Sequence, residues 1–203
     1  MREALKTSSA GVDGRTRRKI DAMRRVQDVA LDLFEARGYA EVSVEAIAEA
    51  AGVGPATVYR NFGGKERIVL WDEYDPLLLG SLGEALSEGP PLQAIQRALS
   101  RALADLYARD RDRILRRARL VAASPELRRA NADNQEALRQ GLTEVLLATR
   151  AARDPLEAAV FGGAIAATIE AAAIAWLAED GVAPLTRHLA KAFRRLERLA
   201  SGG

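Results

Sequence analysis

The segment VSVEAIAEAAGVGPATVYRNFGGKERI, residues 42–68, holds side chains whose types and spacing suit the binding of a phosphate. Lys65 follows the pair Gly63-Gly64 and is expected to open a helix. The partial positive charge at a helix N-terminus disfavours a cation there by roughly 0.3–1 kcal/mol. A phosphate at the same position would reverse this effect, because the free backbone N–H groups and the ammonium would attract one anion. We therefore expect Lys65 to be a phosphate ligand.

A short helix, predicted for residues 54–62, precedes that lysine and offers a polar face. Proline suits its first turn, since the N–H that proline lacks would be unpaired there. Val58 and Phe62 are spaced to anchor the helix in a core. The opposite face could contact the major groove of double-stranded DNA. Its residues are Pro55, Ala56, Thr57, Tyr59, Arg60 and Asn61.

A preceding helix and a tight turn are needed to position these side chains. Ser43 is a suitable N-cap for such a helix, whose apolar face would include Ile47 and Ala48. Gly52 allows the positive φ that a sharp turn requires. Two short helices joined at a glycine, after a long helix that ends near Gly38, are typical of a helix-turn-helix unit. A plain helical hairpin within a bundle has the same pattern, so both interpretations stay open at this point.

The whole chain has the composition of an all-α protein. Alanine, leucine, arginine and glutamate dominate, aromatic residues make up 5%, and the 48% hydrophobic content is sufficient for a core. Residues 1–14 are expected to form a flexible arm, and residues 15–25 are mostly basic. Apolar spacing and Gly/Pro breaks predict helices over residues 16–37, 44–51, 54–62, 65–86, 92–108, 111–123, 125–149, 155–179 and 184–200.

Enzymatic chemistry has little support among the residues of this chain. It contains no cysteine and one histidine, His188, which is expected on the surface of a basic helix. The sequence has no H-E-x-x-H, no G-x-S-x-G and no phosphate-binding glycine loop. We expect no catalytic residue, no cofactor and no metal. A helical adaptor that binds no DNA is a second alternative, for which Lys65→Ala and Tyr59→Ala would change no activity.

Residues 33–70, LFEARGYAEVSVEAIAEAAGVGPATVYRNFGGKERIVL, resemble the DNA-binding domain of TetR-family transcriptional regulators. The ordered elements are LF-x-x-x-G-[YF], [ST]-V-x-x-IA-x-x-AGV, T-x-Y-x-x-F and x-x-K-E. The resemblance implies that residues 54–61 form the recognition helix and that Ser43 caps the preceding helix and binds a phosphate. It also implies that the basic residues 15–19 reach the DNA as an arm. The expected DNA contacts are Ser43, Gly54, Pro55, Ala56, Thr57, Tyr59, Arg60, Asn61 and Lys65.

Two positions depart from the pattern of that family. Pro55 stands where many relatives carry a polar or basic residue, and Asn61 stands where histidine is frequent. Pro55 removes one side chain that could read a base. The base preference of the recognition helix therefore does not follow from the resemblance.

The resemblance also implies a larger helical domain that binds a small effector and forms a homodimer. Aromatic side chains are the expected walls of the effector site, together with an acid, Glu170, inside an apolar run. Glu170 could face the pocket or pair with an arginine across the dimer, and both alternatives stay open. Arg116, Arg117 and Arg119 could meet phosphates of an acyl-CoA or form a solvated basic face. The expected effector-site residues are Trp71, Tyr74, Tyr107, Phe161, Glu170 and Trp176.

The apolar run at residues 158–177 is long enough to suggest a membrane span. Its alanines and glycines and the central Glu170 argue instead for a helix packed against other helices. Its small residues would allow close approach at a dimer interface, and we expect no membrane partner. These interface residues are Gly162, Gly163, Ala166 and Ala167. The N-terminus lacks the apolar region of a signal peptide, so the expected location is the cytoplasm.

Taken together, these features predict a ligand-responsive DNA-binding transcriptional regulator. The domains would be a flexible arm at residues 1–14, a helix-turn-helix domain at 15–68 and an effector-binding and dimerisation domain at 69–203. The resemblance further implies a repressor that binds an inverted-repeat operator as a dimer and is released by a small molecule. The helix at residues 65–86 would connect the two domains and transmit the effector signal.

Overall fold

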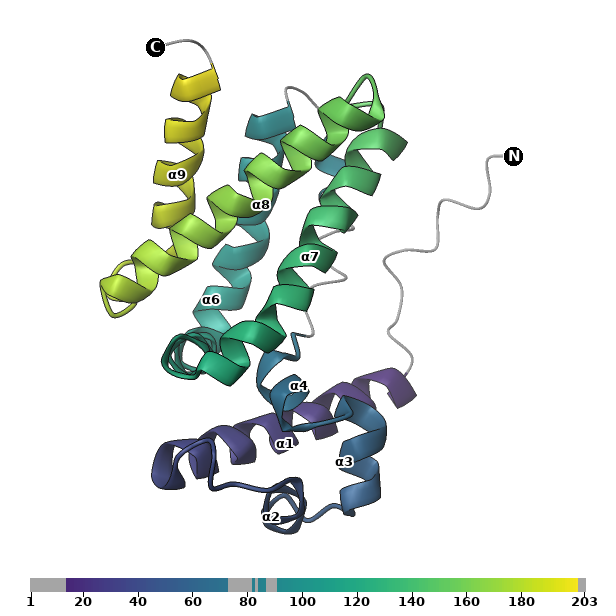
Figure 1. Ribbon diagram of the computed structural model, residues 1–203, viewed down its shortest axis with the longest axis vertical. Helices are drawn as coiled ribbons and strands as arrows, with labels where there is room; N and C mark the ends of the chain where they lie inside the picture. The colour runs from purple at the N-terminus through teal and green to yellow at the C-terminus, as the bar shows by residue number, and fades with distance from the viewer. Residues whose placement is uncertain (1–13, 73–81, 83, 87–90, 201–203) are drawn as a thin grey trace. The chain divides into compact units, whose positions relative to one another are not determined.

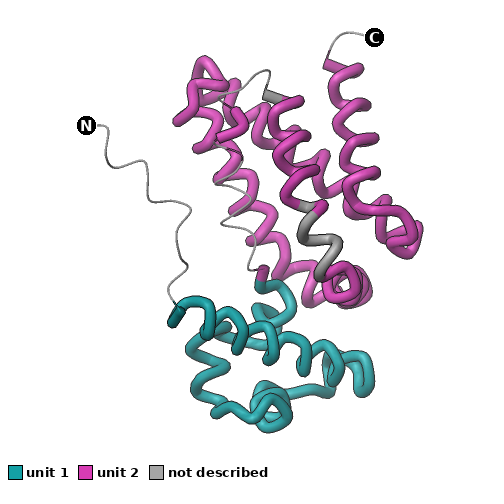
Figure 2. The backbone as a smooth tube through the Cα atoms, turned by 180° about the vertical axis from the view of Figure 1, so that it is seen from behind, with its two compact units in different colours: residues 1–71 teal, residues 72–203 magenta. Residues whose placement is uncertain are grey.

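The structure is a computed structural model that describes residues 14–72, 82, 84–86 and 91–200. These residues are mostly helical, and no strand occurs among them, so the predicted all-α class is confirmed. The chain divides into two compact units, residues 1–71 and residues 72–203 (Figure 2). Each unit has a core of its own, as the alternation of apolar and charged residues on its helices requires.

The N-terminal unit consists of α1 (Gly14–Arg37), α2 (Val44–Ala50), α3 (Pro55–Phe62) and α4 (Lys65–Leu70) (Figure 1). Helix α1 is long and contacts both α2 and α4, while α2 and α4 each contact α3. Buried apolar residues from all four helices meet in the core. They are Met23, Val26, Ala30, Leu31, Phe34, Val44, Ile47, Ala48, Val58, Phe62, Ile68 and Val69.

The basic residues at the start of the chain belong to the first turns of α1. Helix α1 begins at Gly14, and the side chains of residues 15–19 are exposed. The Arg18 Nε donates a hydrogen bond to the Gly14 carbonyl oxygen at 3.1 Å. The segment that was expected to act as an arm is therefore helical. Residues 1–13 lie outside the described part of the chain.

The helix that begins at Lys65 ends at Leu70, so the prediction of one helix through residue 86 is wrong. Trp71 already has an extended backbone, with φ −61° and ψ 124°. The cause is a buried glutamine on α1. The Gln27 side-chain amide donates to the carbonyl oxygens of Ile68 at 2.7 Å and of Trp71 at 2.9 Å. These bonds satisfy carbonyls at the end of α4 that another helical turn would otherwise have paired.

The C-terminal unit contains α6 (Pro91–Ala123), α7 (Pro125–Ala148), α8 (Pro155–Ala178) and α9 (Leu185–Ala200) (Figure 1). Helix α8 packs along α7 and α9, and α6 packs against α7 and α9. Helix α6 is interrupted at Asp110, whose φ of −125° and ψ of 18° are not helical. The sequence predicts two helices that meet at this point, and the structure shows them joined across a kink. The helices α7 and α8 begin at Pro125 and Pro155, as predicted, and their N-caps are Ser124 and Asp154.

Among the described residues, α8 is long and apolar enough to cross a membrane, by its length and composition. Only 33% of its most apolar stretch is buried within the chain. Leu156, Val160 and Ile174 are exposed by 75%, 58% and 62%. The expectation that this helix is covered by its neighbours therefore holds for one side of it only.

His188 is buried, contrary to the expectation of a surface histidine. His188 is 7% exposed, and its Nε2 lies 3.1 Å from Glu179 Oε2. Glu179 is the C-cap of α8, while His188 lies in the first turn of α9. The polar ring can be buried because this carboxylate, contributed by another helix end, gives it a partner.

Candidate nucleic-acid interface

The turn between α2 and α3 has the geometry that ends a helix at a glycine. The Val53 N–H donates to the Ala48 carbonyl at 2.9 Å, and the Gly52 N–H donates to the Glu49 carbonyl at 3.1 Å. This pair of bonds is the Schellman motif, which needs a left-handed residue at its centre. Gly52 supplies it with φ 66°. Ala48 is fully buried at this point, so the two short helices can approach closely.

Helix α3 is held by two apolar side chains and exposes the opposite face. Val58 and Phe62 are 1% and 4% exposed. Gly54 is the N-cap and Pro55 follows it as the first helical residue, as the sequence predicts. The predicted contact residues fall into two groups. Pro55, Ala56, Tyr59 and Arg60 are exposed, whereas Thr57 and Asn61 are half-buried.

Ser43 caps α2, as predicted. Its Oγ accepts a hydrogen bond from the Ala46 N–H at 3.1 Å. The side chain is exposed. Because Oγ is the acceptor in this bond, the bond does not use the hydroxyl hydrogen, which can donate to another group. Ser43 thus combines a structural role with a donor available at the surface.

Tyr59 is tied to Glu45 across the turn. The Tyr59 hydroxyl donates to Glu45 Oε1 at 3.2 Å, which joins α3 to the first turn of α2. This hydrogen bond, with smaller contributions from desolvation and from the charge of Glu45, raises the pKa of Tyr59 above its ordinary value. A carboxylate therefore lies on the face expected to meet DNA. No local signal in the sequence shows that Glu45 meets a residue fourteen positions later.

Lys65 has partners within the N-terminal unit, and its role as a phosphate ligand stays a prediction. Its Nζ donates to the Tyr39 carbonyl oxygen at 3.1 Å and lies 4.4 Å from the centroid of the Tyr39 ring. A second carbonyl, that of Ala40, lies 3.5 Å away. The dipole of α4 does not decide the placement of Lys65, because these loop carbonyls and the ring face attract the cation.

Arg60 is the exposed cation at the centre of the α3 face. Its guanidinium makes one long hydrogen bond, from Nη2 to Thr57 Oγ1 at 3.4 Å, within the same helix. Such a contact is weak and is easily exchanged for another acceptor. The face therefore offers an exposed cation, two hydroxyl groups and the small residues Pro55 and Ala56, which suits close approach to a DNA groove.

Comparison with known proteins identifies both halves of the chain. Residues 27–70 match the bacterial regulatory proteins of the tetR family, and residues 89–200 match the MftR C-terminal domain. The chain belongs to the TetR family. It is therefore a transcriptional regulator with a DNA-binding helix-turn-helix, and the surface of α3 described above is that of the family's DNA-binding domain.

Two relatives of this TetR-family protein are themselves regulators. The putative mycofactocin biosynthesis transcriptional regulator MftR of Mycobacterium tuberculosis is 32% identical over 114 residues, which are 55% of this chain and 57% of that protein. The HTH-type transcriptional regulator TcmR of Streptomyces glaucescens is 38% identical over 87 residues, which are 40% of this chain and 38% of the relative. The matches thus span about half or less of the length of these relatives.

Solved structures of the TetR family share the fold of this protein. Thermus thermophilus FadR, a transcriptional repressor in complex with lauroyl-CoA, is 25% identical with a TM-score of 0.53, over 85% of this chain and 91% of FadR. A putative TetR-family transcriptional regulator from Syntrophomonas wolfei is 17% identical with a TM-score of 0.65, over 91% of this chain and 97% of that chain. The second likeness concerns the fold alone.

The residues expected to line an effector site have different environments in the two units. Trp71 lies in the N-terminal unit, where its ring packs edge-on against Phe62 at 5.9 Å. Phe161 is half-buried against the core of the C-terminal unit, and Glu170 is exposed on α8. Tyr74 and the side chain of Tyr107 lie outside the described residues. The half-buried ring of Trp71 thus packs on α3, and its place in an effector site stays a prediction.

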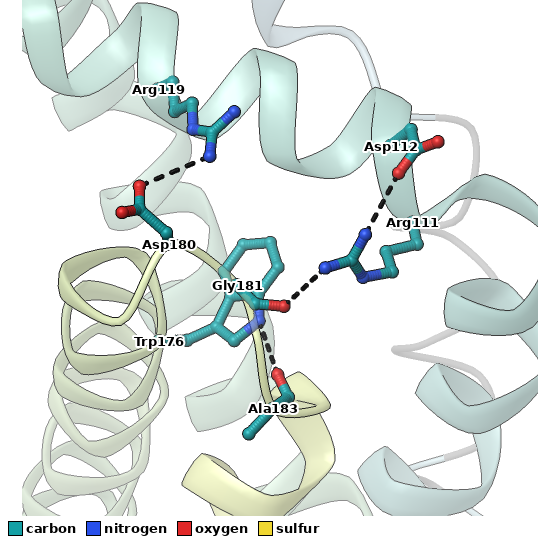
Figure 3. A network of polar contacts seen from close by, with 7 residues as sticks. All are labelled: Arg111, Asp112, Arg119, Trp176, Asp180, Gly181 and Ala183. Atoms are coloured by element: carbon teal, nitrogen blue, oxygen red, sulfur yellow. Dashed lines mark hydrogen bonds and ion pairs between the residues drawn. The ribbon is translucent and has the colours of Figure 1, made fainter.

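Trp176 has a structural role at the turn between α8 and α9 (Figure 3). It is 1% exposed, and its indole N–H donates to the Ala183 carbonyl at 3.0 Å. Arg111 of α6 holds the same turn through the Gly181 carbonyl at 2.8 Å, and Arg119 pairs with Asp180 at 3.3 Å. These contacts fix the start of α9 on α6.

Of the three arginines of α6 that were considered as phosphate ligands, Arg117 and Arg119 are engaged in ion pairs. Arg117 lies 3.2 Å from Asp72 and both side chains are largely buried, whereas the pair of Arg119 and Asp180 is exposed. Arg113 pairs with Asp110 at the kink at 2.8 Å. The second half of α6 thus uses its positive charge to anchor neighbouring parts of the C-terminal unit.

The four small residues expected at a dimer interface lie on two sides of α8. Gly162 is buried against α7, where a Cβ would come within 2.6 Å of Thr143 Oγ1. Ala166 is also buried within the chain. Gly163 has nothing within 4 Å of the position of a Cβ, and Ala167 is exposed. Only Gly163 and Ala167 are therefore placed to meet a partner.

Proposed function

We propose that this protein is a homodimeric repressor that binds an inverted-repeat operator and releases it when a small molecule binds to the C-terminal unit. The observation that carries this proposal is the construction of α3. Val58 and Phe62 fix the helix in the core, and Tyr59 and Arg60 stand exposed on its outer face. An exposed polar helix held rigidly after a glycine turn is the arrangement that enters a major groove. The protein would act in the cytoplasm by binding alone, without a catalytic residue, cofactor or metal.

The proposed contacts divide into those that position the protein and those that read bases. Ser43 and Tyr59 would donate their hydroxyl groups to phosphates, and Lys65 would add its charge from beside the Tyr39 loop. Arg60 would exchange its long bond to Thr57 for a base edge or phosphate. Gly54, Pro55 and Ala56 would lie closest to the groove, since they have little or no side chain to obstruct it. Thr57 and Asn61, both half-buried, would make contacts at the edge of this surface.

Fluorescence anisotropy with DNA from the promoter of the protein's own gene tests this proposal. We expect sequence-dependent binding that weakens steeply as salt concentration rises. Arg60→Ala should weaken binding about 5- to 100-fold if the guanidinium contacts a base. Arg194→Ala is the matched control, because it removes the same charge from the exposed surface of α9. Equal losses in both variants, or binding that is independent of sequence, would reject α3 as the recognition helix.

A homodimer is proposed because an inverted repeat presents two half-sites related by a two-fold axis. The large exposed apolar side chains of α8 support this assembly, since a solvated apolar surface of that kind marks an interaction site. Multi-angle light scattering at micromolar concentration measures the oligomeric state directly. A monomer that still binds one copy per operator would contradict the homodimer while leaving the DNA-binding proposal intact.

For the effector we propose the class of acyl-CoA thioesters. The support is the similarity to the FadR repressor of Thermus thermophilus, whose structure holds lauroyl-CoA. Adding lauroyl-CoA to the protein–operator complex should lower the anisotropy, while coenzyme A without the acyl chain should not. An unchanged complex in both cases, with thermal stability unaffected by lauroyl-CoA, would reject this class and leave the DNA-binding proposal standing.

A further inference from the structure

Helix α3 is too short to hold its own direction. It has 8 residues, Pro55–Phe62, which make about two turns and roughly 12 Å of helix. A helix of this length is marginal in water, so its orientation depends on the surfaces against which it packs. The residue after it, Gly63, has φ 82° and a backbone that is less restricted than that of other residues. The C-terminal end of α3 must therefore be fixed by side chains.

The aromatic ring that supports this end belongs to Trp71. It packs edge-on against the ring of Phe62, with 5.9 Å between the ring centroids. Phe62 is the last residue of α3 and is buried, whereas Trp71 is half-buried. An edge-to-face pair at this distance is favourable beyond the area that it buries and depends on the angle between the rings. The direction of α3 is thus coupled to the position of Trp71.

Two hydrogen bonds fix the backbone of Trp71. The residue follows α4 in an extended conformation. Its N–H makes the last bond of α4, to the Arg67 carbonyl at 2.9 Å. Its carbonyl oxygen accepts a hydrogen bond from the Gln27 side chain at 2.9 Å. The second bond holds the ring-bearing residue against α1 at the point where no further helical turn does so.

The Gln27 amide is suited to this position by its chemistry. It is buried on α1, and its nitrogen faces the carbonyl oxygens of Ile68 at 2.7 Å, Trp71 at 2.9 Å and Val69 at 3.5 Å. A glutamine amide has two N–H donors, which match the two shorter bonds. Methionine has a similar length but no donor, and an ionised glutamate offers acceptors only. These contacts therefore depend on the amide rather than on the size of the side chain.

We propose that Gln27 is a positioning residue for DNA recognition, which acts on α3 through Trp71 and Phe62. This inference rests on the proposed role of α3 as the recognition helix and specifies what orients it. The end of α4 is the link, since α4 contacts both α1 and α3 (Figure 1). Side chains of a binding site must be held within about 0.5 Å and 10–20° of the productive geometry. Loss of the Gln27 bonds frees Trp71, and Arg60 on α3 then leaves that range.

The ratio of the affinities for operator and for unrelated DNA tests this role, because a loss of stability alone does not change which DNA the folded protein prefers. Fluorescence anisotropy compares promoter DNA of the protein's own gene with a scrambled duplex of equal length and composition. Gln27→Met should lower the ratio about tenfold, the size expected when one base contact is lost. Binding to the scrambled duplex should change less than about twofold, since the charges that bind phosphates are unaltered.

Leu31→Ala is the control for destabilisation. It opens a cavity in the core beside the same helix, one turn from Gln27, and leaves the amide and the α4 carbonyls intact. It should lower the Tm of the N-terminal unit and keep the ratio within about twofold of the wild-type value. Circular dichroism at the temperature of the anisotropy assay checks that both variants are folded. An equal fall of the ratio in Gln27→Met and Leu31→Ala would overturn the inference.

Variants of Trp71 give an independent test that leaves the buried glutamine in place. Trp71→Phe keeps an aromatic ring beside Phe62 and should retain the ratio, whereas Trp71→Ala removes the ring and should lower the ratio about tenfold. Adding Gln27→Met to Trp71→Ala should have little further effect, because both changes act on the same contact. An undiminished ratio in Trp71→Ala would contradict the inference, whatever the stability of Gln27→Met.

Fluorine NMR of protein labelled with fluorotryptophan reports on the ring itself. The chain has 2 tryptophans, so Trp71→Phe assigns both signals. Gln27→Met should move the Trp71 signal and leave the signal of Trp176, which belongs to the C-terminal unit, unchanged. A Trp71 signal at the same position in Gln27→Met and wild type would show that Gln27 does not hold the ring, and the proposed role would be rejected.

The outcomes distinguish this inference from the proposed function. A wild-type protein that binds both duplexes equally contradicts both. A wild-type preference for the operator that Arg60→Ala abolishes, together with full preference in Gln27→Met and Trp71→Ala, contradicts the positioning role alone.

Discussion

The Tyr59 hydroxyl of α3 lies 3.2 Å from Glu45 Oε1 of α2 and donates a hydrogen bond to it, so a carboxylate lies beside one of the proposed phosphate donors. A DNA phosphate that approaches Tyr59 meets a negative charge and a hydroxyl that is already engaged. We predict that Glu45→Gln binds the operator more tightly, by roughly 0.5–1 kcal/mol or a factor of about 2–5, because one repulsion is removed. Anisotropy at constant salt measures this. Glu144→Gln, an equal charge change on exposed α7, should leave affinity unchanged.

The same hydrogen bond predicts a pH dependence for Tyr59. The bond to Glu45 raises the pKa of the Tyr59 phenol, so the phenol stays protonated at a pH where a free tyrosine is already ionised. Its contribution to stability is therefore present below the unfolded value of about 10 and is lost as pH rises through the folded value. We expect Glu45→Gln to lower the pKa of Tyr59 toward that ordinary value. An NMR titration of the tyrosine rings measures the change, and an unmoved Tyr59 titration would contradict the contact.

Lys65 should matter for folding as well as for DNA. Its ammonium holds the loop after α1 through the Tyr39 carbonyl and ring. Lys65→Met keeps much of the packing but removes these contacts, and we predict that it lowers the free energy of unfolding of the N-terminal unit by about 1 kcal/mol. Urea denaturation monitored in that unit gives the value. Lys191→Met, on exposed α9, is the control, and equal stability of Lys65→Met and wild type would show that the loop contacts contribute nothing.

Local signals in the sequence were sufficient to place the helix-turn-helix. Ser43, Gly52 and Pro55 each act on the backbone within a few residues, and the structure has the cap, the positive φ and the helix start where they were predicted. The predicted break between residues 108 and 111 coincides with the kink at Asp110. The roles of Gln27, Lys65 and His188 depend on partners far away in sequence or in another helix. No periodicity records such contacts, which is why the end of α4 and the burial of His188 were missed.

Gln27 illustrates the energetic weight of one such contact. Its amide is 1% exposed and donates to the carbonyls of Ile68 and Trp71. Gln27→Met retains the volume but leaves these acceptors without their donor in a buried site. We predict a loss of about 1–3 kcal/mol in the stability of the N-terminal unit. Differential scanning calorimetry and hydrogen exchange of the α4 amides measure it. Gln93→Met, on an exposed surface of α6, should change stability by less than about 0.5 kcal/mol.

Arg150 occupies a backbone conformation that favours glycine. It follows α7 with φ 57°, and the Ala151 N–H donates to the Leu146 carbonyl at 3.0 Å as in the turn at Gly52. A side chain in this left-handed region costs roughly 1–2 kcal/mol. Replacement by glycine would remove this cost. The greater freedom of glycine in the unfolded chain offsets about 0.5–1 kcal/mol of the stabilisation gained. We therefore predict that Arg150→Gly stabilises the C-terminal unit by about 0.5–1 kcal/mol and raises its Tm by about 2–4 °C. Arg150→Ala removes the same exposed side chain without relieving the backbone and should leave the Tm near that of wild type. If both variants melt at the same temperature, the backbone at this position is not strained and the C-terminus of α7 is limited by another contact.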